Sequence, residues 1–129
     1  MHKNIKYEKT GLSKAFSLEL KNKLENHMHT QKPYLKHELR LDDIAEFLDV
    51  SRHHASQVIN ENFKMSFYEY VNTYRITEAK NKLCSGLNSS AQSISDIAYQ
   101  CGFNNRVSFY KAFKKITNTT PTEFIAKAA

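Results

Sequence analysis

The sequence predicts an all-α protein in which two helix-turn-helix units are joined by a long linker helix, with about seven helices in all. The 129 residues include only 3 Gly and 2 Pro, too few for the many tight turns of an all-β fold. Apolar residues recur at helical spacing along most of the chain, and helix-capping residues precede several of these segments. We expect a leading segment with an amphipathic helix at residues 1–34 and a double helix-turn-helix domain at residues 35–129.

Three helices are predicted before residue 66. The first covers residues 13–28, and Pro33 interrupts the chain after it. The second covers residues 41–49 and begins with acidic residues, which suit the positive end of the helix dipole. Ser51 is the N-cap of the third. The residues expected to face the core from these helices are Phe16, Leu20, Leu24, Met28, Ile44, Ala45, Leu48, Ala55, Val58 and Ile59.

The long linker helix is predicted over residues 67–83. Ser66 and Glu69 have the spacing of a capping box at its start, and Gly86 is the expected stop. Residues 88–90 are expected to form a loop. A helix of this length spans about 25 Å at the usual rise per residue, so it can act as a rigid spacer.

Three shorter helices are predicted after the linker. Ser93 and Asp96 cap the first, which ends at Gly102. The second is expected to bury four residues: Phe109, Ala112, Phe113 and Ile116. Thr120, Pro121 and Glu123 have the cap, N1 and N3 chemistry of a final helix start. Of the two cysteines, Cys84 is expected to pack at a helix end and Cys101 in the core.

An internal repeat is the most informative feature of the chain. Residues 43–45 match residues 96–98 (Asp-Ile-Ala) at an offset of 53, and the later inward residues align at 54, Ala55 with Phe109 and Ile59 with Phe113. Each half is therefore a short helix, a tight turn and a second helix, the geometry that places a second helix in the DNA major groove. The alternative is a helix bundle without this role, since two copies are too few for a solenoid.

The outward faces of the two second helices carry DNA-binding chemistry. Arg and Lys donate to guanine, Gln and Asn pair with adenine, and Val can meet a thymine methyl. The candidate DNA-binding residues are Arg52, His53, Ser56, Gln57, Asn60, Arg106, Val107, Tyr110, Lys111, Lys114 and Lys115. We expect Arg106, Gln57 and Lys111 to read base edges and Lys114 and Lys115 to hold phosphates. His53 could do either. Any one of these side chains alone could equally be part of a solvated helix face.

The chain resembles the AraC/XylS family of bacterial regulators over roughly residues 35–126. The resemblance is carried by residues 94–98, residues 101–103, residues 113–115, Thr120 and Phe124, together with Phe109, Pro121 and, more loosely, residues 41–45, Ser51, residues 70–75 and Ala79. It implies seven helices, two reading helices on a linker helix, and control of transcription, usually activation. The implied partners are double-stranded DNA, RNA polymerase and a sensing or dimerising domain outside this chain. It implies no cofactor, metal or small-molecule ligand for this segment.

The sequence departs from the family pattern at several positions. Ala55 and Ile59 stand where larger residues are usual, so looser packing of the first unit is expected. Lys64 and Asn118 stand where Gly is common, Arg40 where Ser or Thr is typical, and Ile125 where Arg is frequent. Residues 6–13 and 32–35 resemble stretches that precede this domain in membrane-anchored members, which leaves a membrane anchor in a longer protein open.

Composition bears on the rival function classes and on location. A net charge of +6 favours a polyanionic partner, so a module that binds proteins or membrane surfaces through basic amphipathic helices is the alternative function. RNA binding is less favoured because no aromatic β-platform is predicted. An enzyme is not expected, since no phosphate loop, nucleophile elbow or zinc-site spacing is found. Two distant cysteines and no signal peptide predict a cytoplasmic location.

Overall fold

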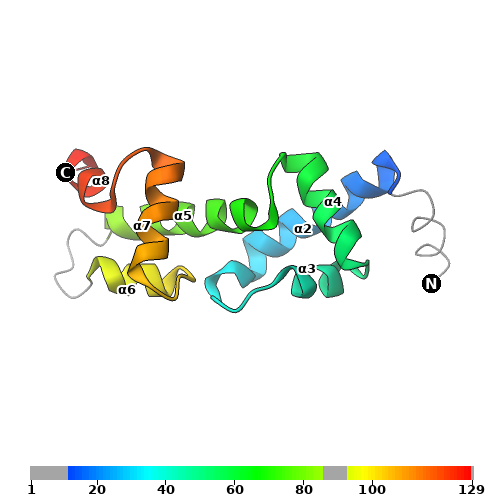
Figure 1. Cartoon of the computed structure of the whole chain (residues 1–129), viewed down its shortest axis with the longest axis horizontal. Helices are drawn as coiled ribbons and strands as arrows, with labels where there is room; N and C mark the ends of the chain where they lie inside the picture. Colours follow the sequence, from blue (N-terminus) through cyan, green and yellow to red (C-terminus); the bar gives the residue numbers. More distant parts are fainter. Residues whose placement is uncertain (1–11, 86–92, 129) are drawn as a thin grey trace. The chain divides into compact units, whose positions relative to one another are not determined.

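The computed structural model describes residues 12–85 and 93–128. Within these ranges it contains seven α-helices, a short 3-10 helix and no strand, which confirms the all-α prediction. The helices of Figure 1 are α2 (Lys14–Gln31), η1 (Pro33–Leu35), α3 (Leu41–Leu48), α4 (Arg52–Phe63), α5 (Phe67–Ser85), α6 (Ile94–Gln100), α7 (Arg106–Thr117) and α8 (Pro121–Ala128). The predicted stop at Gly86, the loop at 88–90 and the start of the leading segment lie outside the described residues.

The chain divides into two compact units. The first comprises residues 1–33 and 38–70, and the second comprises residues 34–37 and 71–129. In the first, α2 packs against both α3 and α4, which also pack against each other. In the second, α7 packs against α6 and α8. The leading helix therefore belongs to the same compact unit as the first helix-turn-helix.

The core of the first unit is formed by the three apolar stripes that the sequence predicts. Leu24, Met28, Ala55, Val58 and Ile59 are completely buried. The small Ala55 is thus fully enclosed despite the looser packing expected there. Each Å² of apolar surface that these side chains remove from water stabilises the fold by about 25 cal/mol.

The core of the second unit is more aromatic. Phe109 and Phe113 are completely buried, and their ring centroids are 5.6 Å apart. Phe113 also meets Phe124 of α8 edge-on at 5.6 Å. Two predictions are wrong here: Ile116 is 38% exposed, and Cys84 is exposed whereas Cys101 is buried as predicted. Ile116 is the penultimate residue of α7, where the chain is about to leave the core.

The helix caps and turns of the two units occur at equivalent positions of the sequence repeat. Ser93 and Asp96 form the predicted capping box at α6. At the equivalent point of α3, Asp43 accepts from the Arg40 backbone N–H at 2.9 Å. The Arg40 position therefore keeps the carboxylate half of the box without a Ser or Thr hydroxyl.

The turn inside each unit has the same hydrogen bond. Val50 N–H donates to Ala45 O at 3.1 Å in the first unit, and Phe103 N–H donates to Ala98 O at 3.0 Å in the second. Both turns need a positive φ, which Asp49 (58°) and Gly102 (101°) supply. A positive φ recurs at the equivalent ends of α4 and α7, where Lys64 (57°) and Asn118 (65°) are the C-caps. Lys32 (49°) ends α2 in the same conformation. The sequence repeat is therefore a repeat of backbone geometry.

Helix starts repeat at the same offsets. Ser13 accepts from Phe16 N–H, and Ser66 forms the predicted capping box with Glu69. Thr120 and Glu123 form the predicted box at α8. Capping residues of this kind contribute about 1 kcal/mol each, so sequence-local chemistry fixes where each helix begins.

A buried arginine, which the sequence analysis missed, fastens the segment after α2 to α5. Arg75 Nε donates to Tyr34 O at 2.7 Å and Arg75 Nη2 donates to Lys36 O at 2.9 Å. Burial lowers the pKa of Arg75. Burial and the nearby Glu78 carboxylate raise the pKa of Tyr34 to about 12. A Cβ at Gly102 would overlap the Tyr34 carbonyl oxygen and crowd Arg75 Nε, so this turn requires glycine for space as well as for φ.

Candidate nucleic-acid interface

Helix α4 presents the first set of predicted DNA-binding residues on one side. Ser51 caps the helix by accepting from His54 N–H at 3.1 Å, and three of its residues are completely buried on the side that faces the core. On the remaining surface, Gln57 is half-buried. The other four predicted residues of this helix are exposed: Arg52, His53, Ser56 and Asn60.

Two of these side chains are already held by neighbours. Arg52 Nε lies 3.4 Å from Asp42 Oδ1 in an exposed ion pair. Gln57 Nε2 donates to Glu61 Oε2 at 2.9 Å, one turn along the same helix. Arg52 and Glu61 are the two charged residues of α4, so the helix carries no net charge at neutral pH. Glu61 was not predicted to belong to the site, although its i, i+4 spacing from Gln57 is visible in the sequence.

Helix α7 presents the second set. Asn105 caps it by accepting from Ser108 N–H at 2.8 Å. The apolar Val107 is 65% exposed, and Tyr110 is half-buried. The remaining predicted residues of this helix are exposed: Arg106, Lys111, Lys114 and Lys115.

An intrahelical contact orients Arg106. Its Nη2 donates to the Tyr110 hydroxyl at 3.0 Å, and its Cζ lies 5.0 Å from the centre of the Tyr110 ring. The guanidinium has five N–H donors, so this contact leaves donors that can still form a bidentate pair. A fixed guanidinium loses less side-chain entropy on binding than a free one.

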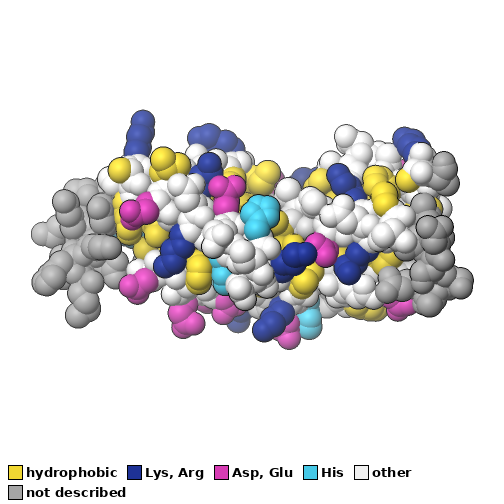
Figure 2. Space-filling view, turned by 180° about the vertical axis from the view of Figure 1, so that it is seen from behind, with side chains coloured by type: hydrophobic (Ala, Val, Ile, Leu, Met, Phe, Trp, Pro, Cys, Tyr) yellow, Lys and Arg dark blue, Asp and Glu magenta, His cyan; other side chains and the backbone are white. Residues whose placement is uncertain are grey.

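The charge of α7 has one sign. Its four basic residues have no Asp or Glu among them, and such a run can neutralise phosphates. Figure 2 shows a different pattern on the face that it draws, where Lys and Arg side chains lie among Asp and Glu side chains. This mixed pattern contrasts with the four basic residues of α7.

A hollow of about 400 Å³ lies beside α4 in the first unit. It is lined by Lys14, Ser17, Leu18, Glu61, Asn62 and Lys64. The residues come from the start of α2, the end of α4 and the residue after α4.

Among the described residues, no group of three or more His, Cys, Asp or Glu side chains is placed to hold a metal ion. None of the described helices has the length and apolarity needed to cross a membrane.

Comparison with known proteins supplies the family. The family model described as "Helix-turn-helix domain" matches residues 44–127. An uncharacterised HTH-type transcriptional regulator of Staphylococcus aureus strain COL is 33% identical over 87 residues, which are 67% of this chain and 11% of that protein. The chain thus spans about a tenth of the length of the curated relatives that it matches.

Solved structures agree with the fold. The C-terminal domain of AraT, a response regulator from Geobacillus stearothermophilus, is 26% identical, with a TM-score of 0.72 and 84% of each chain covered. A transcriptional regulator from Chromobacterium violaceum, described among AraC-type DNA-binding domain-containing proteins, is 25% identical, with a TM-score of 0.72 over 89% of this chain and 96% of that chain. The family model covers more than half of the sequence, and this chain belongs to the AraC-type helix-turn-helix family of DNA-binding transcription regulators.

Proposed function

We propose that α4 and α7 are the recognition helices of this domain and that they read adjacent major grooves of one DNA duplex. One observation carries the proposal: in each unit the predicted residues lie on a helix whose opposite side contributes completely buried residues to the core, Ala55, Val58 and Ile59 in α4 and Phe109 and Phe113 in α7. A helix fixed in this way can enter a major groove without losing its core contacts. The family supports the same role for both helices.

The side chains divide by chemistry. We assign Arg106 and Lys111 to guanine edges and Gln57 to adenine, because these are the pairings that their donors and acceptors allow. Lys114 and Lys115, near the end of α7, are assigned to phosphates. The remaining contacts come from His53, Ser56, Asn60 and Val107, with Arg52 and Tyr110 at the edges of the two faces.

The longer protein would act through DNA binding rather than catalysis. We propose that it regulates transcription, with activation through RNA polymerase as the mode that the family resemblance favours. We also propose that a sensing or dimerising domain controls it, because the chain spans only 11% of the Staphylococcus relative. We propose that the protein is located in the cytoplasm, where bacterial DNA lies.

The test begins with the selection of duplexes from a random-sequence library on the purified chain. Binding of the selected duplex and of a random duplex is then measured for Arg106→Ala and Lys115→Ala. We expect Arg106→Ala to cost about 1–3 kcal/mol on the selected duplex and to relax one base position. Lys115→Ala should weaken both duplexes alike.

Equal losses on both duplexes for the two variants would contradict the assignment of Arg106 to a base. Parallel measurements with RNA and with anionic vesicles at matched salt test the broader proposal. Tighter binding to either of these than to the selected duplex would contradict DNA as the partner.

A further inference from the structure

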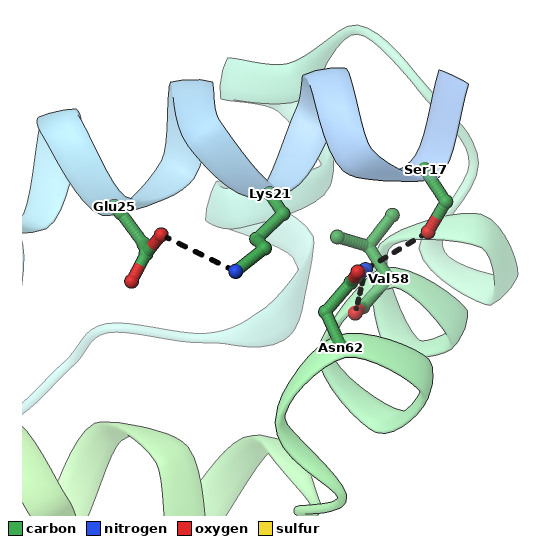
Figure 3. Close-up of polar contacts among 5 residues, drawn as sticks. All are labelled: Ser17, Lys21, Glu25, Val58 and Asn62. Atoms are coloured by element: carbon green, nitrogen blue, oxygen red, sulfur yellow. Dashed lines mark hydrogen bonds and ion pairs between the residues drawn. The ribbon is translucent and has the colours of Figure 1, made fainter. Parts of the chain in front are cut away.

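A chain of hydrogen bonds leads from the leading helix to a predicted base-reading residue. Asn62 Nδ2 donates to Ser17 Oγ at 2.9 Å, and Ser17 Oγ donates to Glu61 Oε1 at 3.3 Å. Gln57 Nε2 donates to the other carboxylate oxygen of Glu61 at 2.9 Å. Figure 3 shows the first of these contacts, with Ser17 on α2 directed at Asn62 on α4. All four residues belong to the first unit.

The directions of these bonds are fixed by chemistry. An ionised carboxylate only accepts hydrogen bonds, so Glu61 must face the NH₂ end of Gln57 and the hydroxyl hydrogen of Ser17. Asn62 then fills the acceptor site of the Ser17 oxygen, and it also donates to Val58 O at 2.8 Å. Ser17 is only 3% exposed, so water does not readily replace these partners. The buried end of the chain of bonds therefore holds the exposed end.

The consequence concerns the amide of Gln57. One N–H is used by Glu61, which leaves the second N–H and the carbonyl oxygen outside this bond. A donor and an acceptor side by side are what adenine requires at N7 and at its N6 amino group. A rotating amide would offer these two groups in either order, whereas a held amide offers them in one order.

Resting on the proposed function, we infer that Ser17 and Glu61 are positioning residues that hold the Gln57 amide in the orientation that reads an A·T pair. The leading helix thereby becomes part of the reading apparatus. Ser17 lies outside residues 44–127 that the family model matches, so the inference adds a feature that family membership does not supply. Glu61 also keeps α4 free of net positive charge, which limits its attraction to phosphates of any sequence.

The experiment measures base discrimination on the selected duplex and on each of its single-base variants. Gln57→Ala should reduce discrimination at one base position by about 5- to 150-fold. Glu61→Ala should reduce it at the same position by a smaller factor, and Ser17→Ala by a still smaller one. Glu61→Gln should restore it, because the Gln side-chain oxygen can accept from Gln57. Both changes at Glu61 should raise affinity for all duplexes, since each removes a negative charge.

A matched control lies on α2, the helix that carries Ser17. Lys21 and Glu25 form an ion pair at 3.9 Å along α2 (Figure 3), so Glu25→Ala removes an acidic residue without touching the chain of bonds. It should leave base discrimination unchanged. Thermal unfolding of each variant separates positioning from folding, because a general loss of fold weakens all duplexes and does not select one base position.

The double variant Gln57→Ala with Glu61→Ala gives the decisive outcome. If Glu61 acts through Gln57, the second change has no further effect on discrimination. An effect that persists, or that appears at another base position, would show Glu61 reading DNA directly and would overturn the inference. If Gln57→Ala leaves every base preference intact while Arg106→Ala does not, the inference fails and the proposed function stands. If no duplex is bound, both fail.

Discussion

The two helix-turn-helix units repeat the same backbone geometry and differ in the chemistry of their second helices, α4 and α7. Turns, caps and helix ends coincide at offsets of 53 and 54, down to the left-handed residues at Asp49 and Gly102. On this common frame, α4 pairs one Arg with one Glu, whereas α7 carries four basic residues without an acidic one. The polar groups of α4 are also tied to α2, while Arg106 of α7 is held by Tyr110 within its own helix.

On the proposed function, this difference in charge predicts a division of roles between the two helices. Phosphate neutralisation supplies affinity that falls with salt and is independent of sequence, and we propose that α7 contributes most of it through Lys114 and Lys115, beside the base contacts assigned to Arg106 and Lys111. Hydrogen bonding by a held, neutral amide supplies discrimination between base pairs, and we propose this role for Gln57 of α4. A backbone fixed by caps and buried side chains leaves the outward residues free to diverge in this way.

The largest expected effect tests the shared turn. Gly102→Ala should destabilise the protein by about 3–5 kcal/mol, because a Cβ there combines backbone strain with overlap against Tyr34 O. Asp49→Ala, at the equivalent turn, should cost at most about 1 kcal/mol, since Asp49 already carries a Cβ at positive φ. Urea unfolding of both variants measures the difference. Equal losses would show that the two turns are interchangeable.

The next effect compares two buried polar residues, Arg75 of the linker helix α5 and Ser17 of the leading helix α2. Arg75→Ala should cost about 2–3 kcal/mol, because it leaves the Tyr34 and Lys36 carbonyls without their donor. Ser17→Ala should cost about 1 kcal/mol, since one hydroxyl with two partners is lost. Thermal unfolding checks the order of the two. A larger loss for Ser17→Ala would mean that its network is mainly structural.

Much of the frame could be predicted from sequence because it is specified locally. The box at Ser66 and Glu69 and the cap at Ser51 each depend on residues within a few positions of each other. Periodicity also found the buried stripe of α7, apart from Ile116. That residue has the right phase but lies where the helix is ending, and the length of a buried stripe depends on packing partners that periodicity does not contain.

The features that the sequence did not predict depend on contacts between distant parts of the chain. Ser17 and Glu61 are 44 residues apart, and nothing in the α2 pattern marks a serine as the partner of a reading helix. Arg75 likewise has the charge expected of an exposed residue on the linker helix. Its burial depends on the distant segment that contains Tyr34 and Lys36, whose carbonyl oxygens accept its hydrogen bonds. The candidate outward residues were identifiable because helix phase places them, whereas their partners were not.

Salt dependence tests the division of roles directly. Lys114→Ala should reduce the slope of log K against log salt by about 1, because one phosphate contact and its released counterion are lost. Asn60→Ala, a neutral change on the exposed face of α4, should leave the slope unchanged. Titrations of the selected duplex at several salt concentrations give both slopes. A change of slope for Asn60→Ala equal to that for Lys114→Ala would contradict separate roles for the two helices.

The smallest expected effect concerns the ion pair that restrains Arg52. The pair with Asp42 is exposed on both sides, so Asp42→Asn should change the free energy of unfolding by only about 0.5 kcal/mol. It should nevertheless raise affinity for all duplexes by about two- to threefold at low salt, because a positive charge on α4 loses its internal partner. Glu46→Gln removes a different exposed acidic residue of α3 and serves as the control for net charge alone. If both variants raise affinity equally, the pairing with Arg52 is irrelevant to binding; if Asp42→Asn alone does so, the balance of charge on α4 is set by its neighbour α3 as well as by Glu61.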